Sequence, residues 1–180
     1  MLAVALVLSL TSCSDKDNEK NTSTDTTTGA TRPAEGSIVK GSIGIGTITI
    51  DGQTYTDAYG IDFNKDGILE FRIVAGGTSL QCEPANGSGD AVRGVAMVGD
   101  RIATLQKHAT ISSSLTYSTS LLSTLPESGS LPEKFYVAFR MDFDGIHYGW
   151  AKVKYENGEL EWDKCAYCTT ANAPLTAGDD

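Results

Sequence analysis

The sequence is poor in basic residues. Among its 180 residues only 14 are Lys or Arg, against 23 Asp or Glu, and the formal net charge is −9. Binding to nucleic acid depends on Lys and Arg side chains that neutralise phosphates, and docking on an anionic lipid surface depends on a basic patch. The composition therefore argues against both kinds of partner.

Histidine is also scarce. His108 and His147 are the only two, and they lie in separate segments without the paired spacing of zinc ligands. No Gly-x-Ser-x-Gly stretch indicates a hydrolase nucleophile. Both histidines are expected at the surface or at a sheet edge, and the chain is expected not to be an enzyme. The alternative is a small secreted-type hydrolase with its site in the long loops.

The chain has no apolar run of the ~20 residues that a membrane-spanning helix needs. The run over residues 2–10 is short and fits the hydrophobic region of a signal peptide, and the small Ser12 and then Cys13 follow it. Behind Cys13, residues 14–36 include no aromatic residue and no Val, Ile, Leu or Met. Such a segment cannot bury enough apolar surface to fold. We therefore expect a signal peptide (1–12), Cys13 with a disordered tether (13–36) and one folded domain (37–180).

Leu10-Thr11-Ser12-Cys13 resembles the lipobox of bacterial lipoproteins. The resemblance implies cleavage before Cys13 and acylation of this cysteine with chains such as palmitate, which anchor the protein in the membrane. The next residues, Ser14-Asp15-Lys16-Asp17, resemble the acidic stretch behind the lipidated cysteine in surface lipoproteins of Bacteroidetes-type bacteria. This resemblance implies that the protein is anchored in the outer membrane and exposed at the cell surface. The alternative is that it stays on the periplasmic side of that membrane.

Turn signals divide the folded domain into short strands. Asp-Gly or Asn-Gly between β-branched or alternating runs is a strong hairpin signal. In the run from Phe135 to Met141, apolar side chains alternate in the two-residue period of a strand, and no long stretch has a helical period. The sequence predicts an all-β fold, an antiparallel β-sandwich of jelly-roll-like or Ig-like type. The main turns are predicted at Asp51-Gly52, Asp66-Gly67, Gly99-Asp100, Asp144-Gly145 and Asn157-Gly158.

One turn has the residue pattern of a calcium loop. Side-chain oxygens at alternate positions can converge on one hard cation, and a glycine after them permits the sharp turn. Position 12 is Ile73, so the bidentate glutamate of an EF-hand is missing. A plain hairpin turn needs the same Asn, Asp and Gly residues, and this alternative stays open. The candidate Ca²⁺ ligands are Asp62, Asn64, Asp66, the carbonyl of Ile68 and Glu70.

Three cysteines remain once Cys13 is lipidated. Exported proteins permit disulfides, and an odd count leaves one thiol over. We expect Cys82 to pair with Cys165 or Cys168, and a local Cys165–Cys168 bridge is the alternative. Cys165 and Cys168 have the spacing of a redox pair. A redox motif lies at a turn from a strand into a helix, whereas these two residues lie at the end of a predicted strand near the C-terminus.

Aromatic residues gather in the last two predicted strands. Tyr148 and Trp150 share one face of their strand, and an exposed face of this kind could stack on sugar rings. Aromatic residues in strands are more often part of the core, which is the alternative.

The C-terminal part resembles exported bacterial β-sandwich modules. The resemblance rests on His147-Tyr148-Gly149-Trp150, on the strand around Tyr167 and on the Ala173-Pro174-Leu175 end. It implies a fold and an exported location, and no catalytic residues. The protein is expected to display a β-sandwich that binds a glycan or a partner protein of the cell envelope. A purely structural role of the displayed domain is the other expectation.

Overall fold

The structure is a computed structural model that describes residues 38–50, 53–65, 67, 69–74, 77–82, 93–120, 123–142 and 144–179. Side chains are described for all of these except 46–50, 53, 55, 57, 81 and 82. The predictions for the signal peptide, Cys13 and the tether lie outside the described residues, as do those for Asp66 and Ile68.

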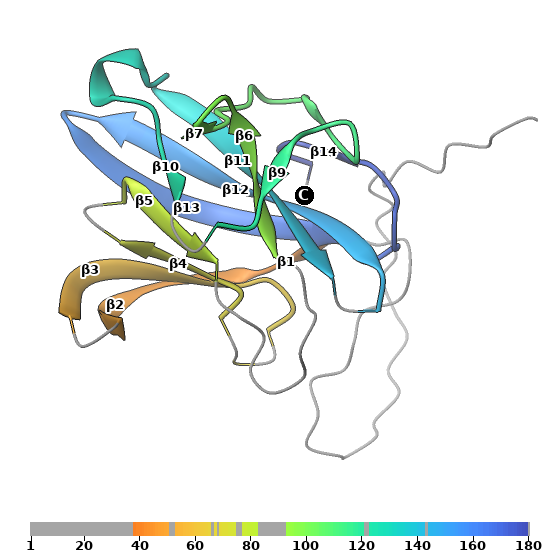
Figure 1. The fold of residues 1–180 in the computed structure, drawn as a ribbon, viewed down its shortest axis with the longest axis horizontal. Coiled ribbons are helices and arrows are strands. Elements are labelled where there is room, and N and C mark those ends of the chain that lie inside the picture. Colours follow the sequence, from red (N-terminus) through yellow and green to blue (C-terminus); the bar gives the residue numbers. More distant parts are fainter. Residues whose placement is uncertain are drawn as a thin grey trace, which may run out of the picture.

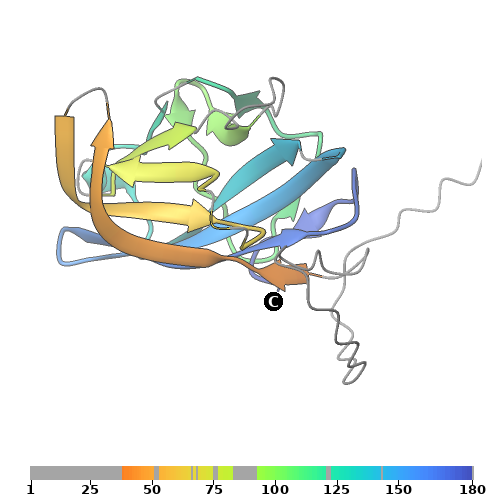
Figure 2. The same ribbon diagram turned by 90° about the horizontal axis from the view of Figure 1, so that it is seen from below.

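The described part of the chain folds as two antiparallel β-sheets that pack face to face, so the predicted all-β sandwich is confirmed (Figures 1 and 2). Its only helical element is a single 3-10 turn, η1 (Ser128–Ser130). The larger sheet has the order β1-β13-β12-β11-β6-β7, with β9 also paired to β6. Its strands are β1 (Ile38–Lys40), β6 (Gly94–Val98), β7 (Arg101–Ile102), β9 (Tyr117–Ser118), β11 (Lys134–Asp142), β12 (Ile146–Glu156) and β13 (Glu159–Cys168).

The smaller sheet has the order β10-β5-β4-β3-β2. Consecutive strands are neighbours from β2 to β5, as expected for hairpins joined by short turns. The crossover comes with β10, which follows β9 of the larger sheet in the chain. The strands are β2 (Ser42–Ile50), β3 (Gln53–Asp62), β4 (Phe71–Val74), β5 (Ser79–Cys82) and β10 (Ser123–Thr124).

The β12–β13 hairpin shows how a predicted turn fixes the register. Glu156 pairs with Glu159, which leaves a two-residue loop. Asn157 has φ 54° and Gly158 has φ 86°. A type I′ hairpin turn needs positive φ at both positions, and Asn-Gly supplies it at little cost. The predicted Asn-Gly turn is therefore confirmed.

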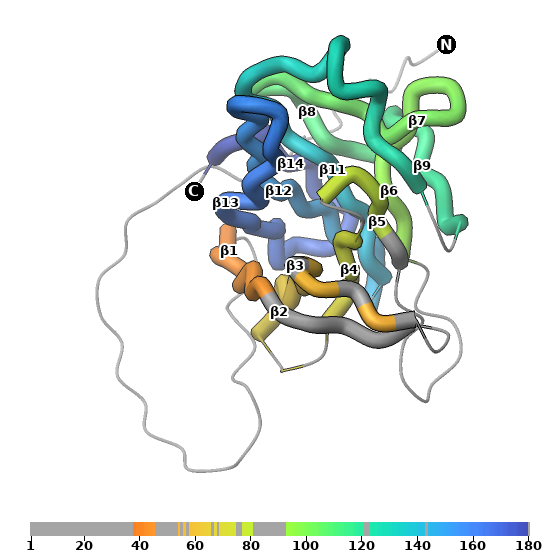
Figure 3. The backbone as a smooth tube through the Cα atoms, turned by 90° about the vertical axis from the view of Figure 1, so that its left-hand side faces the viewer, coloured from red at the N-terminus to blue at the C-terminus, as the bar shows by residue number. Residues whose placement is uncertain are grey.

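Apolar side chains are buried on both faces of the larger sheet. Phe135, Val137, Phe139 and Met141 point into an inner cluster between the two sheets, as their alternation predicts. The other face of β11 and β12 belongs to an outer cluster that includes Tyr136 and Trp150. Two short strands, β8 (Thr110–Ile111) and β14 (Leu175–Thr176), pair with each other and cover this outer face (Figure 3). The connection between β7 and β11 thus packs in part, with Ile111 and Leu115 in or against the outer cluster and Leu125 in the inner one.

Candidate functional site

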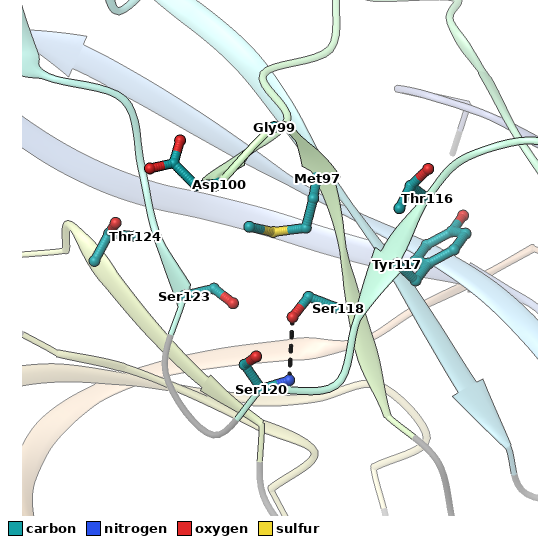
Figure 4. A pocket seen from close by; sticks show the side chains of 9 residues that line it. All are labelled: Met97, Gly99, Asp100, Thr116, Tyr117, Ser118, Ser120, Ser123 and Thr124. Carbon is teal, nitrogen blue, oxygen red and sulfur yellow. Dashed lines mark hydrogen bonds between the residues drawn. The ribbon is translucent and has the colours of Figure 1, made fainter.

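A groove of about 490 Å³ lies where the edges of the two sheets meet (Figure 4). After β9 the chain leaves the larger sheet and reaches β10 of the smaller one, and β10 also lies against β7. Six of the residues that line the groove carry side-chain hydroxyls on or next to β9 and β10. The lining residues are Met97, Gly99, Asp100, Thr116, Tyr117, Ser118, Ser120, Ser123 and Thr124.

The floor of the groove combines an apolar and a polar side chain. Met97 of β6 packs in part against the inner cluster, and its thioether extends toward Ser123 of β10 (Figure 4). Ser123 is only 5% exposed, and its Oγ has no hydrogen-bond partner among the described residues. A buried hydroxyl without a partner is uncommon in proteins. The floor therefore has hydrogen-bonding capacity that the described protein groups do not use.

Two hydroxyl groups of the groove accept hydrogen bonds from neighbouring protein groups. The backbone N–H of Ser120 donates to Ser118 Oγ at 3.1 Å, and Arg101 Nη1 donates to Thr124 Oγ1 at 2.9 Å. Because a hydroxyl has one hydrogen and two acceptor positions, each of these oxygens keeps its own O–H as a donor. At the rim, the Asp100 side chain is 90% exposed and its Oδ1 lies 3.9 Å from Arg101 Nε.

Tyr117 forms part of the groove wall, and its side chain contacts residues that do not line the groove. Its hydroxyl donates to the carbonyl of Ser112 at 3.2 Å, and its ring centroid lies 6.0 Å from that of Tyr148. Burial raises the pKa of Tyr117 well above its ordinary value. The tyrosine therefore stays neutral and belongs to the wall's structure.

The predicted calcium loop is closed by its own carboxylates. Asp62 Oδ2 accepts from the backbone N–H of Gly67 at 3.0 Å. Glu70 Oε2 accepts from the backbone N–H of Phe63 at 2.7 Å, and Glu70 Oε1 lies 4.0 Å from Arg93 Nη2. Glu70 thus faces the backbone and Arg93, as in a capped turn.

One carboxylate oxygen of this loop is not engaged by the described protein groups. Asp62 is buried, and its Oδ1 has no partner among the described residues. Within the described part of the chain no three His, Cys, Asp or Glu side chains form a group that could hold a metal ion, and Asp66 and Ile68 lie outside it. Calcium therefore stays a prediction, and the plain turn stays its alternative.

The cysteines correct one of the two predicted pairings. Cys165 is a free, buried thiol, so the structure does not contain the Cys82–Cys165 bridge. Cys168 is disulfide-bonded, and the side chain of its partner lies outside the described residues. The two residues do not form a redox pair with each other. They point to opposite faces of β13, because Cys165 belongs to the inner cluster and Cys168 to the outer one.

The histidines are separated in the fold, and the prediction for one of them is wrong. His108 is exposed, as expected. His147 is buried: its Nδ1 lies 3.0 Å from the Cys168 carbonyl oxygen, and its Nε2 lies 3.0 Å from Asp144 Oδ1. Neither histidine lines the groove. The reason for the error is that His147 extends from β12 over the end of β13, where segments distant in the sequence enclose it.

The aromatic platform predicted at Tyr148 and Trp150 is also corrected. Tyr148 is 3% exposed and Trp150 is 0% exposed, so neither ring is available for stacking on a sugar. Trp150 packs edge-to-face with Tyr136 at a centroid distance of 5.4 Å. The covering strands β8 and β14 bury this face.

The groove is not predictable from the sequence, because its lining comes from three separate segments. In the sequence, Gly99-Asp100 has only the pattern of a turn, and the hydroxyl-bearing residues 116–124 have no spacing that links them to it. Comparison with protein-family models, curated proteins and solved structures gives no match. Among the described residues, no helix is long and apolar enough to cross a membrane.

Proposed function

We propose that this chain is a lipid-anchored protein of the outer membrane, exposed at the cell surface, whose β-sandwich is a binding module. The observation that carries the proposal is the short apolar run that ends in Leu10-Thr11-Ser12-Cys13, followed by 23 residues without aliphatic bulk or aromatic rings. A hydrophobic signal segment, an acylated cysteine and a polar tether are the parts that such an anchor requires. The acidic residues after Cys13 support the outer face.

The folded domain supports binding more than catalysis. The groove presents hydroxyls, a carboxylate and a thioether on short strands at the sandwich edge. The rival hydrolase could use His147 or His108, but neither lines the groove. The buried His147 has its two ring nitrogens 3.0 Å from oxygens of Cys168 and Asp144. An imidazole held on both sides is poorly placed to accept a proton from a nucleophile.

The anchor is tested by replacing the acylated residue. The full chain and its Cys13→Ala variant are expressed in a bacterium with an outer membrane and labelled with an alkyne analogue of palmitate. We expect label and membrane fractionation for the wild type and for the neighbouring control Ser14→Ala, and neither for Cys13→Ala. An unlabelled wild type with the same fractionation as Cys13→Ala would overturn the proposal.

Surface exposure is tested separately on intact cells. Protease added from outside should degrade the wild-type protein and spare a periplasmic marker. Replacing Asp15 and Asp17 with Asn should protect the protein while leaving the palmitate label in place. Protection of the wild type would place the module on the periplasmic side, against the proposed surface display.

A further inference from the structure

We propose that the groove between β6, β7, β9 and β10 binds a neutral oligosaccharide. The inference rests on the proposed function, because it names the class of ligand that the displayed module takes. It replaces the buried pair Tyr148 and Trp150 as the location of a glycan site.

The hydrogen-bonding groups of the groove match those of a polyol. The hydroxyls of Ser118 and Thr124 already accept from protein donors, so their own O–H groups remain to donate. The Asp100 carboxylate can only accept. A sugar hydroxyl both donates and accepts, and a pair of adjacent sugar hydroxyls can therefore satisfy both kinds of group at once.

The floor of the groove contains a hydroxyl without a hydrogen-bond partner among the described residues. Ser123 Oγ is buried and has no partner among the described residues, and its side chain lies beside Met97 and faces Ser118 and Ser120 (Figure 4). A hydroxyl group kept away from both water and protein partners is costly. A ligand hydroxyl that reaches the floor would remove this cost, and this favours a ligand rich in hydroxyls over an apolar one.

The floor of the groove also offers an apolar contact. Sugar rings present C–H groups as well as hydroxyls. Met97 offers a flexible, polarizable thioether on the groove side while packing against the inner cluster on the other. The aromatic ring of Tyr117 is engaged with Tyr148 in the wall. The groove thus supplies a small apolar contact, suited to one or two sugar rings.

Charge selects among carbohydrates. Asp100 is the only ionisable carboxylate that lines the groove in the described part of the chain, and the whole chain carries a formal net charge of −9. Both negative charges, that of Asp100 and that of the whole chain, would repel an anionic ligand such as a uronic acid, a sulfated sugar or a sialoside. Neutral oligosaccharides are therefore expected over acidic ones.

The experiment uses the full chain, purified in detergent, on an array of neutral and acidic oligosaccharides. Neutral hits are then titrated by calorimetry against the wild type and three groove variants. Because hydrogen bonds to a charged group contribute more than neutral ones, Asp100→Ala should weaken binding by about tenfold or more. Thr124→Val and Ser123→Ala should each weaken binding about three- to tenfold.

Matched controls keep the result specific to the groove. Thr110→Val makes the same chemical change on β8, and Asp179→Ala removes a carboxylate near the C-terminus. Both should bind like the wild type, and all variants should have unfolding midpoints close to that of the wild type. Because Asp100 is exposed, Asp100→Ala tests the proposal even if Ser123→Ala fails to fold.

Three results would overturn the groove as a neutral-glycan site. They are an array without neutral hits, a preference for acidic glycans, or hits that Asp100→Ala and Thr124→Val leave unchanged. The failure of the anchor would appear elsewhere, in the palmitate labelling of Cys13. A labelled, membrane-bound protein with a negative array therefore refutes the glycan inference alone.

Discussion

Glu70 Oε2 accepts a hydrogen bond from the backbone N–H of Phe63 at 2.7 Å, and this contact helps to close the loop between β3 and β4. Glu70 is almost fully buried, and its second oxygen faces Arg93 at 4.0 Å. Phe63 is itself a core residue whose ring packs edge-on against Phe71 and Phe139. The carboxylate therefore links the loop's backbone to the centre of the sandwich.

Removing this carboxylate should destabilise the fold. Glu70→Ala leaves the Phe63 N–H without its acceptor and removes the carboxylate that faces the buried Arg93 guanidinium, at a cost of about 2–4 kcal/mol in the free energy of unfolding. Glu70→Gln keeps an acceptor oxygen and should cost less. Urea unfolding of the full chain measures both. A loss for Glu70→Ala no larger than that for the exposed control Asp100→Ala would contradict this role.

The calcium prediction has a sharper form now that the loop's contacts are known. Asp62 Oδ1 is the oxygen without a described partner, while Glu70 is engaged by Phe63. An ion would thus start from Asp62, with Asn64, Asp66 and the Ile68 carbonyl around it. We expect Ca²⁺ to raise the melting temperature by mass action, with an affinity of about 10⁻⁴–10⁻³ M, as in extracellular modules.

The calcium experiment is a thermal melt with and without several millimolar Ca²⁺, followed by EDTA. Asp66→Ala should abolish the gain, and Asp144→Ala, at a different turn, should not. Mg²⁺ at the same concentration controls for general salt effects. A melting temperature that neither Ca²⁺ nor EDTA changes would show that these residues form only a plain turn.

Trp150 gives a test of the corrected aromatic platform. Because its ring is fully buried in the outer cluster, Trp150→Ala should lower the free energy of unfolding by about 3–5 kcal/mol. Val98→Ala, at a side chain 72% exposed, should change it by less than about 0.5 kcal/mol. Denaturant unfolding compares the two. Wild-type stability of Trp150→Ala combined with lost glycan binding would restore the platform.

Local patterns predicted the strands and turns well, because both depend on neighbouring residues. The alternation from Phe135 to Met141 and the Asn157-Gly158 turn needed no knowledge of the rest of the chain. Burial of Trp150 did need it, since strands around Ile111 and Leu175 cover that face. A strand buried on both faces and one with an exposed aromatic face have the same two-residue period.

The groove also could not be predicted from local sequence patterns. Met97, Ser118 and Ser123 meet only because the chain passes from one sheet to the other between β9 and β10. No spacing in the sequence links these three residues. Hydroxyl-rich segments are also common in ordinary loops, so composition alone could not distinguish a binding wall from a connection.

The cysteines provide a last prediction that joins the fold to the anchor. Burial, reinforced by the Glu70 and Asp62 carboxylates, raises the pKa of the Cys165 thiol to about 12. Because the thiolate is the reactive form, its fraction at pH 8 is about a thousandfold below that of an ordinary thiol. Iodoacetamide should therefore leave Cys165 unmodified in the native protein and alkylate it rapidly in urea.

Peptide mapping of the same unreduced sample identifies the partner of Cys168, which is disulfide-bonded. A cysteine whose sulfur carries a lipid through a thioether cannot form a disulfide. The anchored protein must therefore join Cys168 to Cys82, and Cys82→Ser should release a reactive thiol at Cys168. A Cys13–Cys168 peptide in protein from intact membranes would exclude acylation of Cys13, and with it the proposed anchor. Rapid native alkylation of Cys165 would contradict its burial between the sheets.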